Sequence, residues 1–173
     1  MRILVGYTNL RPEVSEALDL YAVPAGHEPV YEDCRASNDR YFEALEHEWR
    51  AGADFAVVEH DVVIDERVMA GFQACPEPWC GYGYDIAVGY RVALGCTRFR
   101  AELMAAVPDL LERCMEETQS GVPAKAWYRL DVRIDEVLRR AGYTAHLHMP
   151  PVAHLNESNR LATPIPPWQP GDA

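Results

Sequence analysis

The sequence predicts an α/β domain in which helices flank a mostly parallel sheet, an arrangement that is Rossmann-like. Over residues 1–65, strand-like and helix-like segments alternate as β-α-β-α-β, which is typical of parallel strands joined by crossover helices. The third strand begins with FAVV at 55–58, an unbroken apolar run that favours burial on both faces. A chain of 173 residues also suits a single domain with one substantial core.

The first two strands are expected at residues 2–7, RILVGY, and 28–33, EPVYED. The segment between them reads as a helix. Pro12 suits a first helical turn, and apolar residues recur at helical spacing from Val14 to Tyr21.

A longer helix is predicted within residues 37–52, SNDRYFEALEHEWRAG. Any of three polar residues can cap its start: Ser37, Asn38 or Asp39. Three large apolar side chains share one face and are expected in the core: Phe42, Leu45 and Trp49. Gly52 stands where a glycine commonly follows the last helical residue.

The second half of the chain has a different character. It is expected to begin with a loop at 75–84 that is rich in proline, glycine and aromatic residues, followed by short strands within 88–98. A helix from 99 that is broken near Pro108 and a loop at 119–126 come next. The last expected elements are a helix from Asp131 to Arg140 and a strand at 144–149. Residues 1–156 are expected to form one domain, followed by a proline-rich tail at 157–173.

Charge and composition exclude some classes of protein. The net charge of −11 argues against a protein that coats nucleic acid, so we expect no non-specific DNA binding. No apolar run approaches the ~20 residues of a membrane span, and the first residues lack the cleavage site of a signal peptide. Five scattered cysteines fit reduced thiols. We therefore expect a cytoplasmic protein that does not bind a membrane.

Two of the cysteines, Cys75 and Cys80, are close in sequence. Their spacing differs from that of the usual zinc knuckle, and no second cysteine pair completes the set. The sequence alone therefore disfavours a structural zinc site at this pair.

The stretch FAVVEHDVVIDE, 55–66, interrupts an apolar segment with Glu59, His60 and Asp61. A buried carboxylate needs a cation, a metal or water, and ligands of open α/β sheets collect at the carboxyl ends of strands. Hard divalent cations prefer carboxylate oxygens, and manganese also accepts imidazole. Three late histidines could complete one site: His146, His148 and His154. The alternative is that His60 only ends a strand and the late histidines are ordinary polar positions.

The order of elements over roughly residues 1–156 resembles the GT-A fold of nucleotide-sugar-dependent glycosyltransferases. In that fold a strand ends in a short acidic motif, usually Asp-x-Asp, which holds a divalent metal on the donor's diphosphate. Glu59-His60-Asp61 stands at the matching place, with Glu at the first position. The resemblance implies Asp61 as a metal ligand, Glu59 and His60 beside the donor, and Mn²⁺ or Mg²⁺ as the ion.

Other stretches resemble the same family. GYTN, 6–9, matches the loop after the first strand, which implies that Tyr7, Thr8 and Asn9 pack on the nucleotide. In YEDCRASND, 31–39, Asp33 matches an acid that contacts the base or ribose.

The C-terminal part carries two further resemblances. PVAHLN, 151–156, is similar to the segment that supplies a metal-binding histidine, which implies His154 rather than His148. WYRLD, 127–131, resembles an aromatic-x-x-acid motif whose Asp opens a helix facing the acceptor. The whole run also resembles small phage-encoded glycosyltransferase-like proteins.

These resemblances imply a metal-dependent glycosyltransferase that moves a sugar from a nucleotide sugar to an acceptor hydroxyl, with a protein, glycan or nucleic-acid base as the unknown acceptor. Asp131 is the first candidate for the base and Asp135 the second; alternatively, Asp131 is an N-cap. Charge at the diphosphate could come from one of three arginines: Arg11, Arg98 or Arg100. Three aromatic residues could stack on a sugar: Trp79, Tyr82 and Tyr84. Trp79 suits the core equally well.

Two alternative functions remain open. The first is a non-catalytic nucleotide- or sugar-binding module of the same fold, favoured by the short chain and by Glu59 in place of Asp. The second is a metal-dependent phosphohydrolase that uses His60 and Asp61. The His-Asp phosphohydrolases place that pair on a helix, whereas here it follows a Val-rich, strand-like run.

Overall fold

A six-stranded sheet forms the centre of the computed structural model, which describes residues 1–37, 39–83, 94–116 and 127–155. The strand order across the sheet is β2-β1-β3-β6-β5-β7. These strands are β1 (Arg2–Tyr7), β2 (Glu28–Asp33), β3 (Phe55–Val58), β5 (Trp79–Tyr82), β6 (Cys96–Phe99) and β7 (His146–His148). Only β6 runs antiparallel to its neighbours, so the predicted mostly parallel sheet is confirmed.

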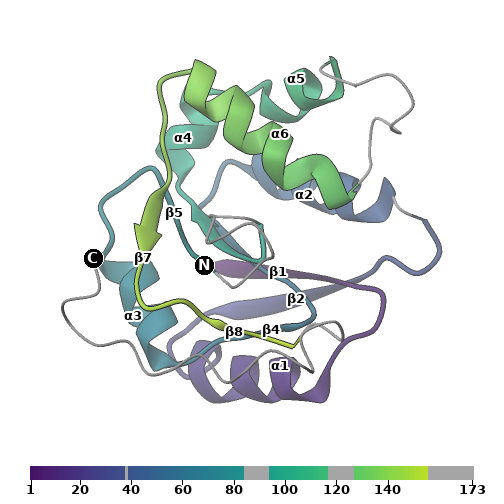
Figure 1. Cartoon of the computed structure of the whole chain (residues 1–173), viewed down its shortest axis with the longest axis vertical. Helices are drawn as coiled ribbons and strands as arrows, with labels where there is room; N and C mark the ends of the chain where they lie inside the picture. Colours follow the sequence, from purple (N-terminus) through teal and green to yellow (C-terminus); the bar gives the residue numbers. More distant parts are fainter. Residues whose placement is uncertain (38, 84–93, 117–126, 156–173) are drawn as a thin grey trace.

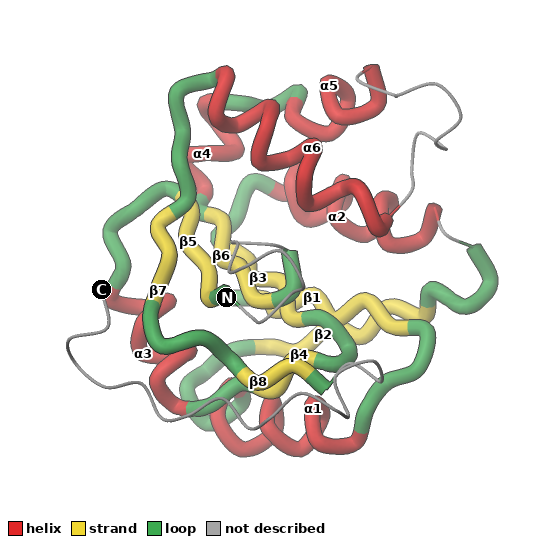
Figure 2. The backbone as a smooth tube through the Cα atoms, in the orientation of Figure 1, coloured by secondary structure: helices red, strands yellow, loops and turns green. Residues whose placement is uncertain are grey.

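Helices cover both faces of this sheet (Figure 1). On one face lie α2 (Asp39–Ala51), α4 (Ala101–Ala106), α5 (Leu110–Glu116) and α6 (Trp127–Arg140). On the other lie α1 (Pro12–Ala17), its π-helical continuation η1 (Leu18–Ala22) and α3 (Glu66–Ala74). A separate two-stranded sheet, β4 (Val62–Val63) with β8 (Ala153–His154), lies on the α1 side (Figure 2). None of these helices is long and apolar enough to cross a membrane.

The first half of the chain folds as its apolar pattern predicts. β1 and β2 occupy the expected residues and pair in parallel from Arg2–Glu28 to Tyr7–Asp33. β3 also pairs in parallel with β1, and its four residues are all buried. The sheet separates two apolar clusters, one under each helix layer, which explains why β3 reads as an unbroken apolar run.

The two helices of the first half begin and end close to their predicted positions. Pro12 is the first residue of α1. The Ser37 hydroxyl accepts a hydrogen bond of 3.1 Å from the Asp39 backbone N–H at the start of α2, whereas residue 38 lies outside the described residues. Gly52 follows α2 with φ of +68°, a conformation that favours glycine. The predicted core face of α2 is buried: Phe42, Leu45 and Trp49.

The prediction of a loop at 75–84 is wrong over residues 79–82, because these residues form the strand β5. All four of its residues are buried, and it pairs with β6 on one side and with β7 on the other. The prolines that suggested a loop, Pro76 and Pro78, lie just before the strand, in the turn that follows α3. Neighbouring strands therefore outweighed the local preference of Gly81 for irregular structure.

Helix α6 begins at Trp127, so the predicted start at Asp131 is wrong. Asp131 lies one turn inside the helix, and the interpretation of this residue as an N-cap is also wrong. The break near Pro108 is confirmed, because α4 ends at Ala106 and α5 begins at Leu110. Residues 84–93, 117–126 and 156–173, including Tyr84 and the expected tail, lie outside the described part of the chain.

Candidate functional site

The acidic triplet after β3 forms a turn at the carboxyl end of that strand. The Val62 N–H donates to the Glu59 carbonyl over 3.1 Å, which closes the turn around His60 and Asp61. The Glu59 N–H donates to the Gly95 carbonyl over 2.9 Å, and the Arg11 N–H donates to the His60 carbonyl over 3.2 Å. The backbone therefore ties the triplet to the segment after β1 and to the turn before β6. His60 and Asp61 lie on a turn after a strand, not on a helix as in the His-Asp phosphohydrolases.

Asp61 and His154 come together although 92 positions separate them, from 61 to 154. β4 pairs antiparallel with β8, with Val62 opposite His154. The Leu155 N–H donates to the Asp61 carbonyl over 2.7 Å, and His154 Nε2 lies 3.2 Å from Asp61 Oδ2. The choice of His154 over His148 as the histidine beside Asp61 agrees with this geometry, because His148 lies on β7.

The Asp61–His154 pair is largely shielded from solvent, with side-chain exposures of 19% for Asp61 and 9% for His154. Burial alone would raise the pKa of Asp61. The hydrogen bond from His154 and the nearby His154 and His60 rings outweigh burial, so the pKa lies below the ordinary value of an aspartate. Asp61 is therefore held as a carboxylate, the form that binds a cation.

The second carboxylate oxygen of Asp61 has a different environment. Asp61 Oδ1 is buried and has no hydrogen-bond partner among the described residues. A buried acceptor without a partner costs about 1–3 kcal/mol, more when it is charged. A cation beside Asp61 would remove this penalty.

The candidate ligand atoms of Asp61 and His154 fit a hard divalent ion. Two neighbouring ligands of an octahedral ion with bonds near 2.1 Å lie roughly 3 Å apart, and Asp61 Oδ2 and His154 Nε2 lie 3.2 Å apart. Among the described residues, no third His, Cys, Asp or Glu forms a compact ligand group with these two. Mg²⁺ commonly binds through one or two carboxylates plus substrate phosphates, so oxygens of a diphosphate and water would complete the shell.

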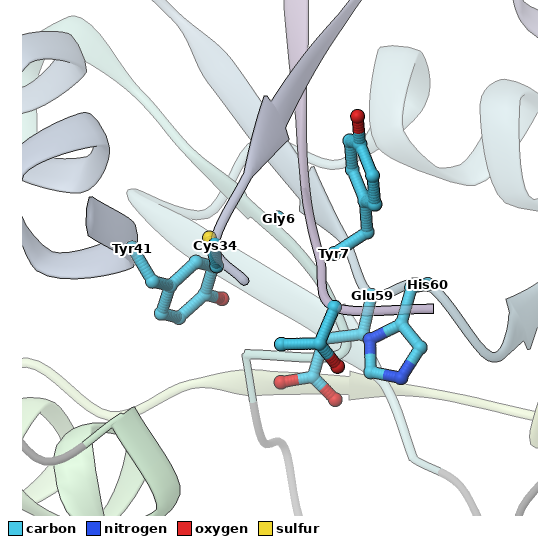
Figure 3. Close-up of a pocket in the computed structure, with 7 residues that line it drawn as sticks. Gly6, Tyr7, Cys34, Tyr41, Glu59 and His60 are labelled. Carbon is cyan, nitrogen blue, oxygen red and sulfur yellow. The ribbon is translucent and has the colours of Figure 1, made fainter. Parts of the chain in front are cut away.

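A pocket opens beside this turn at the carboxyl ends of β1, β2 and β3 (Figure 3). Its empty space is ≈ 410 Å³, including space open to solvent. Four of its lining residues were predicted: Tyr7, Thr8, Glu59 and His60. In Figure 3 the Glu59 carboxylate and the His60 ring lie next to each other, with Tyr41 across the pocket.

Sequence reasoning missed three lining residues: Gly6, Cys34 and Tyr41. A Cβ at position 6 would lie 2.3 Å from Tyr41 Cδ2, so glycine is required for this ring to pack against β1. Gly6 opens the GYTN segment, and that glycine was the available signal. Tyr41 and Cys34 carried none, because both read as ordinary apolar positions.

The other residues that were predicted to bind the nucleotide sugar lie outside the pocket lining. Asn9 is exposed, and the Arg11 side chain lies 3.9 Å from Glu13. Arg35 binds the carboxylate of Asp33 through Nε at 2.9 and 3.0 Å. These hydrogen bonds hold the pKa of Asp33 at about 2, so Asp33 stays ionised at the end of β2.

Two of the three candidate diphosphate arginines are bound elsewhere. Arg98 is 4% exposed and donates to the carbonyls of Phe72, Cys75 and Glu77. Arg100 donates to the Pro76 carbonyl and lies 3.9 Å from Asp54. Asp54 precedes β3, so Arg100 lies at the opposite end of that strand from Glu59. Neither faces the pocket, so only Arg11 remains.

The candidate bases lie on α6. Both carboxylate oxygens of Asp135 accept hydrogen bonds of 2.8 Å from Arg139 Nε one turn later. Asp131 is partly buried in the helix interior, one turn closer to the start of α6. Both candidates therefore lie on α6, and the carboxylate of Asp135 is engaged in an ion pair.

The predicted sugar-stacking role of the aromatic residues is wrong for Trp79 and Tyr82. Trp79 is 2% exposed and stacks on Phe99 with centroids 5.9 Å apart. The Tyr82 hydroxyl donates to the Arg67 carbonyl over 2.9 Å beneath α3. Both are core residues.

Comparisons with known proteins agree with this fold. No protein-family model matches the sequence, and no curated protein matches it. The structure is similar to a glycosyltransferase involved in the glycosylation of the major capsid of PBCV-1, with a TM-score of 0.54 and 13% identity over 86% of this chain and 81% of that one. It is also similar to A197 from STIV, with a TM-score of 0.52 and 16% identity over 85% and 80% of the two chains. At such identities these likenesses show the fold, which is a glycosyltransferase-like Rossmann-type fold.

Proposed function

We propose that this chain is a metal-dependent glycosyltransferase that moves a sugar from a nucleotide sugar to an acceptor hydroxyl. The observation that carries the proposal is the Asp61–His154 pair at the carboxyl end of β3, beside a pocket that Tyr7, Thr8, Glu59 and His60 line. The buried Asp61 Oδ1 without a partner supports a cation there. The likeness to the PBCV-1 glycosyltransferase is consistent with this function.

Each residue has a role in the proposed donor complex. Tyr7 and Thr8 pack against the nucleoside, with Asn9 and Asp33 at the rim of the pocket and Arg11 near the diphosphate. Asp61 and His154 hold Mn²⁺ or Mg²⁺, with Glu59 and His60 beside it. A divalent ion bound there would act as a Lewis acid that neutralises charge on the diphosphate leaving group.

In the transfer step, the bond from the anomeric carbon to the diphosphate oxygen breaks and a bond from that carbon to the acceptor oxygen forms. The diphosphate leaves with the electron pair of the broken bond. The acceptor proton passes to a carboxylate base, for which we propose Asp131 first and Asp135 second. Asp135 is second because its carboxylate already pairs with Arg139 at 2.8 Å.

A thermal-shift panel of nucleoside diphosphates and nucleotide sugars, with Mn²⁺ and with chelator, tests the donor site. A ligand at 100 times its Kd stabilises the fold by about 2.7 kcal/mol, so the matching nucleotide raises the midpoint only when Mn²⁺ is present. The variants Asp61→Asn and His154→Gln should lose this shift. Asp109→Asn is the matched control, because Asp109 also pairs with a cation but lies on the α4–α5 connection, on the far side of the sheet from β4 and β8.

Turnover separates an enzyme from a binding module of the same fold. Release of the nucleoside diphosphate from the identified donor, measured with and without candidate acceptors, should be lost in Asp131→Asn while the thermal shift is retained. A manganese-dependent shift without release would instead support the non-catalytic module. No shift with any nucleotide would contradict the donor site itself.

A further inference from the structure

A second group of metal-ligating side chains lies at the other edge of the sheet, away from β1 and β2. Cys75 follows directly after α3, and Cys80 lies on β5. β7 pairs in parallel with β5, which places His146 opposite Cys80 and His148 opposite Tyr82. Alternation along β7 turns both histidines to one face of the sheet. The fold therefore brings two thiols and two imidazoles from three separate elements into one place.

The geometry of this group is compact. One ligand atom each from Cys75, Cys80 and His148 lies within 4.8 Å of the others, and no other such group of three occurs among the described residues. Cys75 Sγ lies 3.9 Å from His146 Nδ1, and the His146 and His148 rings stack with centroids 4.6 Å apart. His146 thus borders this group of three at the side of Cys75.

We propose that Cys75, Cys80 and His148 bind a zinc ion, with His146 as the fourth ligand. Two thiolates and two imidazoles form a common tetrahedral structural set for zinc. Ligand atoms in such a site lie roughly 3.3–3.8 Å apart, so side chains that already lie within 4.8 Å need to close by only about 1 Å. The sequence argued against zinc here because no second cysteine pair follows, but the second pair consists of histidines that β7 supplies.

The burial of the group favours a bound ion over a chance cluster. Cys75 is 6% exposed and Cys80 is fully buried. His148 Nε2 is buried and has no hydrogen-bond partner among the described residues, which leaves a nitrogen lone pair or N–H unsatisfied. His146 is exposed at the sheet edge, and so offers the ion a route in from solvent.

A buried arginine lies beside the proposed cysteine ligands. Arg98 lies opposite Cys80 across the β5–β6 pair, is buried, and forms no ion pair with a carboxylate among the described residues. A buried cation needs a counter-charge, and a thiolate at Cys80 supplies one.

Zinc here would fasten the edge strand β7 to the end of α3. β7 pairs with β5 over three residues only, which is a short attachment for an edge strand. The chain then continues from His148 to His154, the histidine beside Asp61. The zinc site would therefore be a structural anchor that shares no residue with the proposed donor site.

Cobalt substitution tests the proposal directly. The reduced, chelator-treated protein is titrated with Co²⁺ and the spectrum is followed. We expect a thiolate-to-cobalt charge-transfer band and the intense visible bands of tetrahedral cobalt, saturating at one equivalent and abolished by one equivalent of Zn²⁺. Because only thiolates give the charge-transfer band, binding at Asp61 and His154 cannot mimic it.

Variants locate the ligands. Cys80→Ala and Cys75→Ala should lose the charge-transfer band, and His148→Ala should weaken zinc binding by more than about 100-fold in competition with a chromophoric chelator. Cys96→Ala is the matched control, since Cys96 is buried on the same face of the sheet but is not part of the ligand group. It should retain the band.

Three results would overturn the proposal. The first is the absence of a charge-transfer band in the reduced wild-type protein. The second is a band that survives in both Cys75→Ala and Cys80→Ala. The third is a Cys75–Cys80 disulfide in freshly purified protein, seen by mass spectrometry without reductant. If a cysteine variant fails to fold, the wild-type titration and the His148→Ala affinity still decide the question.

Discussion

Replacing Gly6 by Ala tests how the floor of the pocket is built. The added Cβ would lie 2.3 Å from Tyr41 Cδ2 and 2.6 Å from Cε2, whereas carbon atoms in contact prefer about 3.5–4.0 Å. Tyr41 is only 6% exposed and packs within the core cluster beneath α2, so its ring has little room to turn away. Gly6→Ala should therefore displace either the ring or β1.

Overpacking of this kind costs about 1–3 kcal/mol of unfolding free energy. For a domain of this size, each kcal/mol lowers the melting temperature by about 2–4 °C. Urea unfolding of the wild type and of Gly6→Ala, analysed with a common m-value, measures the loss. The same displacement moves the Tyr41 ring against the pocket, so any nucleotide affinity should fall with it.

A double-mutant cycle assigns the loss to the ring. In the Tyr41→Leu background the clash is removed, and Gly6→Ala should then be neutral or stabilise by up to about 1 kcal/mol, because glycine is unfavourable inside a strand. An equal cost of Gly6→Ala in both backgrounds would refute the steric explanation and indicate a backbone requirement at position 6.

Three further predictions follow from ionised side chains. Because the pKa of Asp61 is lower in the folded than in the unfolded chain, its contribution to stability is complete above the unfolded value and is lost as pH falls through the folded value. The stability difference between the wild type and Asp61→Asn should shrink across that window, and a pH-independent difference would contradict this. Arg35→Ala should raise the pKa of Asp33 from about 2 towards the ordinary aspartate value, as measured by carboxyl-carbon NMR; an unchanged value would show that Arg35 is not its cause. Asp65 accepts hydrogen bonds from the Arg67 and Val68 N–H groups at the start of α3, so Asp65→Ala should cost about 1 kcal/mol in urea unfolding and Asp65→Ser should recover most of it.

The accuracy of the sequence analysis followed the kind of physical signal available. β1 and β3 were predictable because strands of a parallel sheet covered on both sides are apolar over their buried length. β2 lacks this signal, since it is an edge strand without a buried residue. β5 was not predictable, because its pairing with β6 and β7 is long-range and its flanking prolines favour a turn locally. Arg98 shows the same limit, since an arginine buried under three backbone carbonyls has no signature in a single sequence.

The candidate site divides in a similar way. Asp61 was identifiable because a carboxylate that ends an apolar strand requires a partner. The choice of His154 rested on resemblance, since no local pattern distinguishes it from His146 and His148. In the fold, those two histidines instead lie beside Cys75 and Cys80, which the sequence had set aside for lack of a second ligand pair.

Both candidate metal sites depend on the same C-terminal segment. Between β7 and β8, Val152 N–H donates to the Gly83 carbonyl, and directly after β8, Leu155 N–H donates to the Asp61 carbonyl. The buried side chain of Val152 and the pairing of β8 with β4 also hold this segment, with His148 at one end and His154 at the other. An ion at the cysteine–histidine group would therefore reduce the freedom of His154 before any donor binds. Zinc removal should consequently weaken manganese-dependent nucleotide binding, even though no residue is shared between the two sites.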